Sequence, residues 1–182
     1  EDWIKSVDAG LEKLKERCSQ IFITGLSMGG TLTLYSAAVH ADLIKGAIPI
    51  NGAVISKNPD FATLAFMANA PATVPGVGGD IKQPGVTELA YSDVPVPAVR
   101  QIFALTSVTR TLLPRVVCPT LVIQSREDHI VEPENATFIM DNIGSENKRL
   151  LWLDESYHVA TLDNDKELIA QEILKFVDSV KQ

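Results

Sequence analysis

The 182-residue chain is long enough for one domain with a sizeable hydrophobic core. Its 46% hydrophobic and 21% charged residues are ordinary for a globular protein and exclude a disordered or fibrous chain. The formal net charge of −7 argues against nucleic acid and anionic membrane surfaces as partners.

The two cysteines, Cys18 and Cys118, do not have the spacing of a metal or redox motif. Isolated thiols of this kind are typical of a reducing compartment, so we expect a cytoplasmic protein without a metal site. No apolar run approaches the ~18 residues of a membrane span, and we therefore expect no integral membrane association.

The first 53 residues alternate between helix and strand patterns. Apolar residues recur at helical spacing from Trp3 to Cys18, which predicts an amphipathic helix. Apolar strands are predicted at residues 21–24 and 46–51, the second weakened by Pro49, with a helix at residues 31–40 between them. The chain begins without methionine and inside a helical pattern, so we expect that it starts late in a longer protein.

Residues 54–117 differ from the rest of the chain. Prolines and glycines break this segment into short pieces, and two helices are predicted at residues 61–70 and 99–113. The segment also carries many apolar side chains, which predicts a packed, partly mobile cap. We therefore expect a core made of residues 1–53 and 118–182, with a cap inserted between the two parts.

The last part of the chain returns to regular alternation. Strands are predicted at residues 119–124 and 150–153, with a helix beginning near Pro133 between them. A final helix has its apolar face at residues 168–180. Strands that alternate with helices predict an α/β fold with a mostly parallel sheet covered on both faces.

A Gly-x-Ser-x-Gly pattern, with Gly25, Ser27 and Gly29, lies between the first predicted strand and its helix. This strand–turn–helix context is that of a nucleophile elbow. The glycines let strand and helix pack closely, and the helix N-terminus directs N–H groups at the serine oxygen. Glycine-rich turns with a serine also join strands to helices without any catalytic role, so the pattern alone leaves both interpretations open.

Three loops that follow predicted strands carry Ser27, Asp128 and His158, and the carboxyl ends of parallel strands converge on one site. Their order, Ser–Asp–His, is the order of the α/β-hydrolase class. A histidine can take the serine proton because its unperturbed pKa of about 6.5 is close to working pH. Asp128 would orient that imidazole and stabilise its charged form.

Other residues compete for two of these roles. Glu127 and Glu132 lie near Asp128 and are alternatives for the acid. His129 and His40 are alternatives for the base. We expect His129 to have a surface or supporting role beside Asp128, and His40 to cap the end of its helix.

Six stretches of the chain resemble the bacterial carboxylesterases and monoacylglycerol lipases of the α/β-hydrolase superfamily. They run from near the start to near the end of the chain, and the last is the most specific: residues 25–35, 49–51, 88–91, 117–119, 127–129 and 156–163. The resemblance implies an α/β-hydrolase fold with a small helical cap, a Ser27–Asp128–His158 triad and no cofactor. It further implies that the Met28 backbone N–H stabilises the oxyanion and that Glu88 binds glycerol hydroxyls. The alternative for Glu88 is a solvated carboxylate on the surface.

The chain departs from this family at its start. Family members carry several strands before the elbow strand, and a His-Gly loop that supplies a second oxyanion N–H. These features are missing here, and the loss of one donor costs roughly 10²–10³ in rate. We expect either a longer native protein or a separate chain that completes the sheet, and self-association through the open sheet edge.

Two functions are compatible with these features. The first is a serine hydrolase that cleaves short to medium acyl esters, monoacylglycerols included, through an acyl-enzyme. The alternative is a non-catalytic α/β-hydrolase fragment that binds an apolar ligand or a partner chain. The intact triad positions favour the enzyme, and the missing oxyanion loop favours the binding protein.

Overall fold

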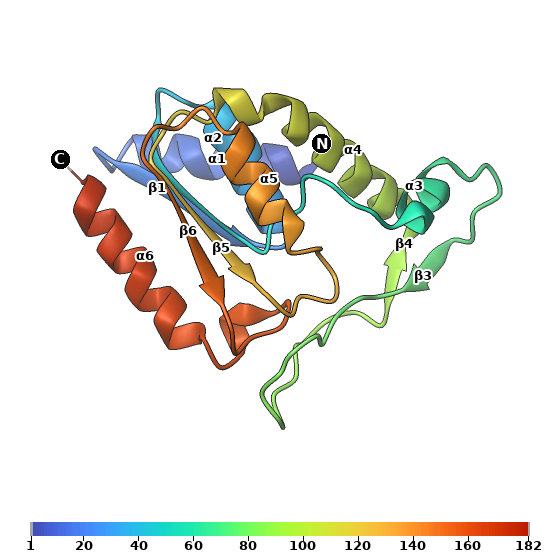
Figure 1. The fold of residues 1–182 in the computed structure, drawn as a ribbon. Coiled ribbons are helices and arrows are strands. Elements are labelled where there is room, and N and C mark those ends of the chain that lie inside the picture. The colour runs from blue at the N-terminus through green and yellow to red at the C-terminus, as the bar shows by residue number, and fades with distance from the viewer. Residues whose placement is uncertain (1, 182) are drawn as a thin grey trace.

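The computed structural model describes residues 2–181, whose main feature is a four-stranded parallel sheet with helices on both faces (Figure 1). The strand order across the sheet is β1-β2-β5-β6, so β1 and β6 are its edges among the described residues. Most buried positions of the strands carry apolar residues, and the polar exceptions are Thr120, Gln124 and Ser125 of β5. The strands are β1 (Ile21–Leu26), β2 (Ile44–Ile50), β5 (Thr120–Ser125) and β6 (Lys148–Leu153).

Two hydrophobic clusters cover the two faces of the sheet. Leu34 and Ile139 belong to the cluster beneath α1 (Asp2–Lys15), α2 (Met28–Val39) and α5 (Glu134–Asn142). Phe176 belongs to the cluster beneath α6 (Lys166–Val180), on the opposite side of the sheet in Figure 1. Within β5, Val122 faces the first cluster and Leu121 and Ile123 face the second, as the two-residue period of a strand requires. The predicted α/β fold is therefore confirmed.

The segment between β2 and β5 contains two helices and a second small sheet. α4 packs against both α2 and α3, and β3 pairs with β4 in antiparallel orientation. The sequence predicted the helices but not these strands, because each has only three residues and one of them is proline in each case. The elements are α3 (Pro59–Phe66), β3 (Thr73–Pro75), β4 (Asp93–Pro95), α4 (Val96–Leu112) and the short 3₁₀ helix η1 (Leu113–Arg115).

Both helices between β2 and β5 begin earlier than the sequence suggested. α3 begins at Pro59 and α4 contains Pro97 in its first turn, where proline is tolerated because it removes an N–H that has no helical acceptor. α3 ends at Phe66 because Met67 adopts an extended conformation. Pro49, which weakened the prediction of the second strand, lies inside β2 opposite Gly25 of β1.

Within residues 2–181, no helix has the length and apolar content needed to cross a membrane. The same residues contain no group of three or more His, Cys, Asp or Glu side chains placed to hold a metal ion.

Candidate active site

Ser27 occupies the turn between β1 and α2, and its backbone lies in the left-handed region with φ of 58°. This conformation is uncommon for a residue with a side chain and marks a strained position. A Cβ atom on Gly25 would lie 2.5 Å from the carbonyl carbon of Gly29, so the strand and helix can approach this closely only with glycine at position 25. Gly25 thus permits the sharp turn that presents the serine. The same role expected for Gly29 is wrong, because a Cβ atom there would meet no atom within 4 Å.

The base of this turn is tied to the neighbouring strand. The Ser27 N–H donates to the carbonyl oxygen of Ile50 at 2.9 Å. Met28 is the first residue of α2, and the first N–H groups of a helix have no acceptor within the helix. The Met28 N–H therefore has the helical position that the expected oxyanion role requires, and that role stays a prediction.

The structure brings Ser27, His158 and Asp128 together in one hydrogen-bonded chain. Nε2 of His158 lies 2.8 Å from Oγ of Ser27, and Nδ1 lies 2.9 and 3.0 Å from the two carboxylate oxygens of Asp128. The side chain of His158 is 6% exposed and that of Asp128 is fully buried. With its proton on Nδ1, the imidazole donates to Asp128 and accepts from the serine hydroxyl.

Neighbouring groups fix the orientation of the Asp128 carboxylate. One of its oxygens accepts from the backbone N–H groups of Ile130 and Val131 at 2.9 and 2.8 Å. The other accepts from Nε2 of Gln124, at the end of β5, at 3.3 Å. These bonds leave the carboxylate facing the His158 ring.

The competing histidines lie elsewhere. The His129 ring is directed to Asp80, with Nδ1 2.8 Å from Oδ1. His40 is the C-terminal cap residue of α2, and its ring bonds to Asp8 of α1 at 2.9 Å. Of the three histidines, only His158 is within hydrogen-bond distance of Ser27.

The competing carboxylates also have other partners. Glu127 is 3.4 Å from Nζ of Lys82, and Glu132 accepts from the backbone N–H of Lys57 at 2.8 Å. Asp128 is the carboxylate that contacts His158, and its role as the acid stays a prediction.

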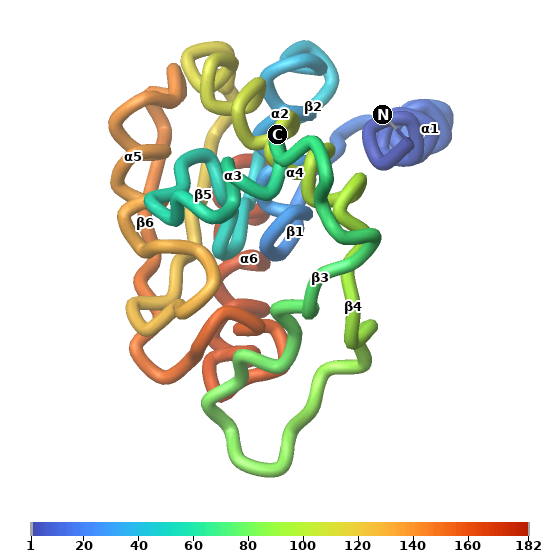
Figure 2. The backbone as a smooth tube through the Cα atoms, turned by 90° about the vertical axis from the view of Figure 1, so that its right-hand side faces the viewer, coloured from blue at the N-terminus to red at the C-terminus, as the bar shows by residue number. Residues whose placement is uncertain are grey.

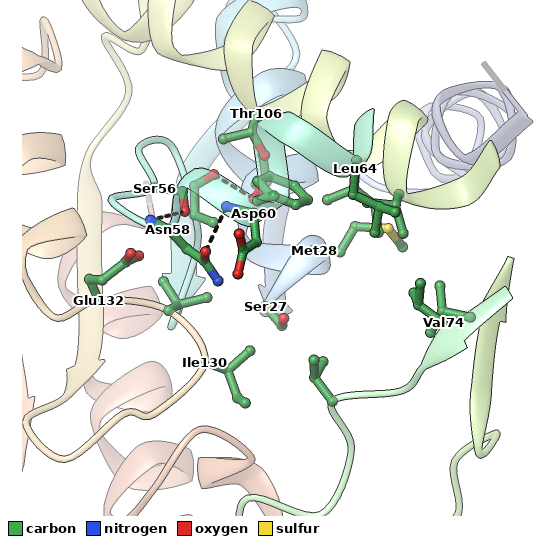
Figure 3. Close-up of a pocket in the computed structure, with 18 of the residues that line it drawn as sticks. Ser27, Met28, Ser56, Asn58, Asp60, Leu64, Val74, Thr106, Ile130 and Glu132 are labelled. Atoms are coloured by element: carbon green, nitrogen blue, oxygen red, sulfur yellow. Dashed lines mark hydrogen bonds between the residues drawn. The ribbon is translucent and has the colours of Figure 1, made fainter. Parts of the chain in front are cut away.

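Ser27 lines a cavity of about 370 Å³. This volume is within the roughly 300–1,000 Å³ usual for small-molecule sites. Figure 3 shows Ser27 and Met28 near its centre, with Leu64 and Val74 to one side and Asn58 to the other. Most of the lining is apolar. Most of the apolar lining residues come from three places, which are α3 and α4 (Phe61, Leu64, Val99, Ile102), the small sheet (Val74, Pro75, Val94) and the loops of the core (Ala53, Ile130, Val131).

Glu88 is not among the residues that line this cavity. It lies in the connection between β3 and β4, where its carboxylate accepts a hydrogen bond of 3.2 Å from the Gly79 N–H. Asp60, in the first turn of α3, is a carboxylate that does line the cavity. A contact between Glu88 and a glycerol hydroxyl stays a prediction.

Asn51 is a site residue whose role the sequence did not suggest. It follows β2 directly, is completely buried and has a positive φ of 45°. Its Nδ2 donates to the carbonyl oxygen of His158 at 2.7 Å and its Oδ1 accepts from the Ser125 N–H at 2.8 Å. The available signal was a polar residue placed immediately after a buried strand, at the edge where the other site residues lie.

Comparisons with known proteins show which proteins the chain is similar to. Residues 86–165 match the family described as serine aminopeptidase, S33. The chain is 44% identical to a thermostable monoacylglycerol lipase of Bacillus sp. (strain H-257), over 96% of this chain and 69% of that protein. It is 28% identical to a carboxylesterase of Bacillus subtilis (strain 168), over 99% of this chain and 73% of that protein.

The chain is also similar to solved structures of lipolytic enzymes. A structure from work on LipS and LipT, two metagenome-derived lipolytic enzymes, superposes with a TM-score of 0.96 at 52% identity, covering 98% of this chain and 73% of that one. A monoglyceride lipase of Saccharomyces cerevisiae shares the fold, with a TM-score of 0.77 at 16% identity over 100% of this chain and 69% of that one.

Proposed function

Because the chain belongs to the bacterial monoacylglycerol lipase and carboxylesterase family of α/β-hydrolases, we propose that it cleaves carboxylic esters with Ser27 as nucleophile. The observation that carries this proposal is the 2.8 Å approach of His158 Nε2 to Ser27 Oγ, beside an apolar cavity. Asp128 and His158 are the proposed acid and base of the triad.

The reaction follows from these positions. Ser27 Oγ attacks the ester carbonyl carbon while His158 Nε2 takes the hydroxyl proton. Asp128 stabilises the imidazolium, and the Met28 N–H donates to the oxyanion. His158 then protonates the leaving alcohol, which departs as the acyl-enzyme forms. Water attacks the acyl carbon with His158 as base, and the acid is released as Ser27 regains its proton.

The proposed substrates are esters of short to medium acyl chains, with monoacylglycerols among them. The apolar lining of the cavity supports an acyl chain as the buried part of the ligand. The similarity to a monoacylglycerol lipase supports a glycerol ester as the natural substrate. Glu88 remains the proposed partner of the glycerol hydroxyls, and residues 54–117 the proposed cap over the core.

The position of β1 at the edge of the sheet supports a second proposal, which is self-association of the chain. Among residues 2–181, β1 pairs with β2 only, so its other side offers N–H and C=O groups to a further strand. We therefore propose that the 182-residue chain self-associates through β1. The alternative of a non-catalytic protein that binds an apolar ligand or a partner chain would use this same edge without the triad.

Covalent labelling tests the proposed function directly. A fluorophosphonate should label Ser27, with the adduct mapped by mass spectrometry, and Ser27→Ala should lose both labelling and the hydrolysis of p-nitrophenyl butyrate. Ser36→Ala is a matched control, since Ser36 is a buried serine of the same helix, α2. Labelling at another residue, or unchanged hydrolysis in Ser27→Ala, would reject the assignment.

A further inference from the structure

Asp80 lies in the connection between β3 and β4, far from the triad in sequence, yet it contacts both loops that hold the proposed acid and base. Its Oδ2 accepts from the backbone N–H of His158 at 3.0 Å and from that of His129 at 3.2 Å. Its Oδ1 is 2.8 Å from Nδ1 of the His129 ring. One carboxylate thus holds the backbone of the proposed base and of the residue that follows Asp128.

The same stretch of the connection is bound to the His158 loop at two further points. The Val159 N–H donates to the backbone carbonyl of Asp80 at 3.0 Å. Asp163, which is completely buried, accepts from the N–H groups of Lys82 at 2.7 Å and Tyr157 at 2.9 Å. The backbone at residues 157–159 is therefore anchored by the β3–β4 connection, which passes beside it in Figure 2, and by the Asp163 carboxylate.

The Asp80 side chain is 15% exposed, and its charge state suits this position. Burial alone raises the pKa of Asp80, but the hydrogen bonds from His129 and His158 outweigh it and hold the pKa below its usual value. A charged carboxylate is an acceptor only, and all three of its close contacts are nitrogen groups. Bonds to a charged acceptor are roughly twice as strong as neutral ones.

Resting on the function proposed above, we infer that Asp80 is a positioning residue for ester hydrolysis, which holds the His158 backbone so that Nε2 stays within reach of Ser27. Asn51 holds the His158 carbonyl oxygen from the sheet, and Asp80 holds its N–H from the connection. The proposed base is thus fixed from both sides. Catalytic geometry consequently depends on the docking of a segment outside the sheet.

The expected effect is on turnover rather than on substrate binding. Asp80 is not among the residues that line the cavity, so its removal should leave KM for p-nitrophenyl butyrate within about 2-fold. A displacement of about 1 Å at a reacting group can cost up to ~10²-fold in rate. We therefore expect Asp80→Ala to lower kcat by about 10- to 100-fold.

The experiment compares Asp80→Ala, Asp80→Asn and the control Asp93→Ala at a temperature where all are folded by circular dichroism. Asp93 is a carboxylate of β4 whose side chain bonds to Ser92 and to neither triad loop. kcat is expressed per active site titrated with a fluorophosphonate, so a loss of folded protein does not count as a loss of turnover. Asp80→Asn keeps an oxygen for the two backbone N–H groups, and its kcat should lie about 3-fold or more below wild type and above that of Asp80→Ala.

Each outcome decides the inference. Reduced kcat per site with unchanged KM, in the order wild type, Asp80→Asn, Asp80→Ala, supports it. A kcat within 2-fold of wild type in Asp80→Ala, with Ser27 labelled normally, overturns it and leaves the proposed function intact. Absence of labelling at Ser27 in wild type overturns the proposed function and the inference with it. If Asp80→Ala does not fold, Asp80→Asn decides alone, and a wild-type kcat overturns the inference.

Discussion

The carbonyl oxygen of His158 accepts a hydrogen bond of 2.7 Å from the side-chain amide of Asn51, two residues separated by 107 positions in the chain. The same amide bonds to the backbone and the hydroxyl of Ser125, at 2.8 and 3.1 Å. Asn51 follows β2 and Ser125 ends β5, so one buried side chain joins two central strands to the loop of the proposed base. The stability of the fold and the geometry of the proposed active site therefore both depend on the Asn51 side chain.

Asn51→Ala should therefore destabilise the protein and slow the reaction. The change leaves the buried Ser125 N–H and His158 carbonyl without this partner, at about 1–3 kcal/mol for each unsatisfied group. It also places alanine at a positive φ, which asparagine tolerates better. We expect a loss of about 2–4 kcal/mol in the free energy of unfolding, measured by urea denaturation.

Asn142→Ala is the matched control for this prediction. Asn142 is exposed at the end of α5, where its amide donates to Phe138 O within its own helix. Exposed substitutions of this kind usually change stability by within ±0.5 kcal/mol. Equal effects of the two substitutions would show that the contacts of Asn51 with the His158 loop are not important.

Substitution of His158 and of His129 should affect turnover differently. His158→Ala removes the group that contacts Ser27, so hydrolysis of p-nitrophenyl butyrate should fall by at least ~10³-fold. His129→Ala leaves the Ser27–His158–Asp128 chain in place and should retain turnover within about 3-fold. Steady-state kinetics of the two variants check this, and the reverse pattern would mean that His129 is the base.

Recognition of glycerol is tested at Glu88. A site that bonds a hydroxyl discriminates against ligands that lack it, so Glu88→Ala should lower kcat/KM for a monoacylglycerol by about 10-fold or more and spare p-nitrophenyl butyrate. Because the structure places Asp60 and not Glu88 on the cavity lining, Asp60→Ala is measured in parallel. A selective loss in Asp60→Ala alone would move the hydroxyl contact to α3.

Local sequence patterns were enough to predict most of the fold and to propose the three residues at the centre of the site. The surface helices α1 and α6 are amphipathic, the strands of the main sheet contain short apolar runs, and Ser27, Asp128 and His158 follow strands in the order Ser–Asp–His. The pairing of β3 with β4 was not predictable, because it joins two three-residue segments across a long irregular connection. The roles of Asn51 and Asp80 depend on contacts 107 and 78 positions away, which no local pattern encodes.

The ion pair between His129 and Asp80 gives stability a pH dependence. The hydrogen bond to Asp80 is the main reason that the pKa of His129 is raised, and slight desolvation opposes it. A raised histidine pKa contributes stability that is fully present below the unfolded value of about 6.5 and is lost as pH rises through the folded value. The lowered pKa of Asp80 contributes stability that is lost only as pH falls through that lowered value, below about 3.8.

Thermal melts of wild type and His129→Ala should therefore differ most near pH 6 and converge toward pH 9. The His129 ring is 59% exposed, so the pair is worth under about 1 kcal/mol, or at most ~2–4 °C in Tm. Thr111→Ala removes an exposed hydroxyl that donates to the backbone carbonyl of Val108, and it should show a difference that is constant with pH. A difference for His129→Ala that grows above pH 7 would contradict the prediction.

The edge of the sheet at β1 leads to the last prediction. Among the described residues β1 bonds to β2 on one side only, and its length of six residues is enough to template another strand. The exposed position within it is Thr24, on a strand whose other side chains are buried or half-buried. A lysine at an edge position opposes strand addition, because pairing would bury its charge.

We therefore expect the 182-residue chain produced by itself to elute above 19.8 kDa in size-exclusion chromatography with light scattering, and Thr24→Lys to shift it toward the monomer. Thr137→Lys adds the same charge at an exposed position of α5, away from the edge, and should leave the association unchanged. An equal shift in both variants would mean that net charge, rather than the β1 edge, controls association. A wild-type monomer with a cooperative melt would show that β1 needs no further strand.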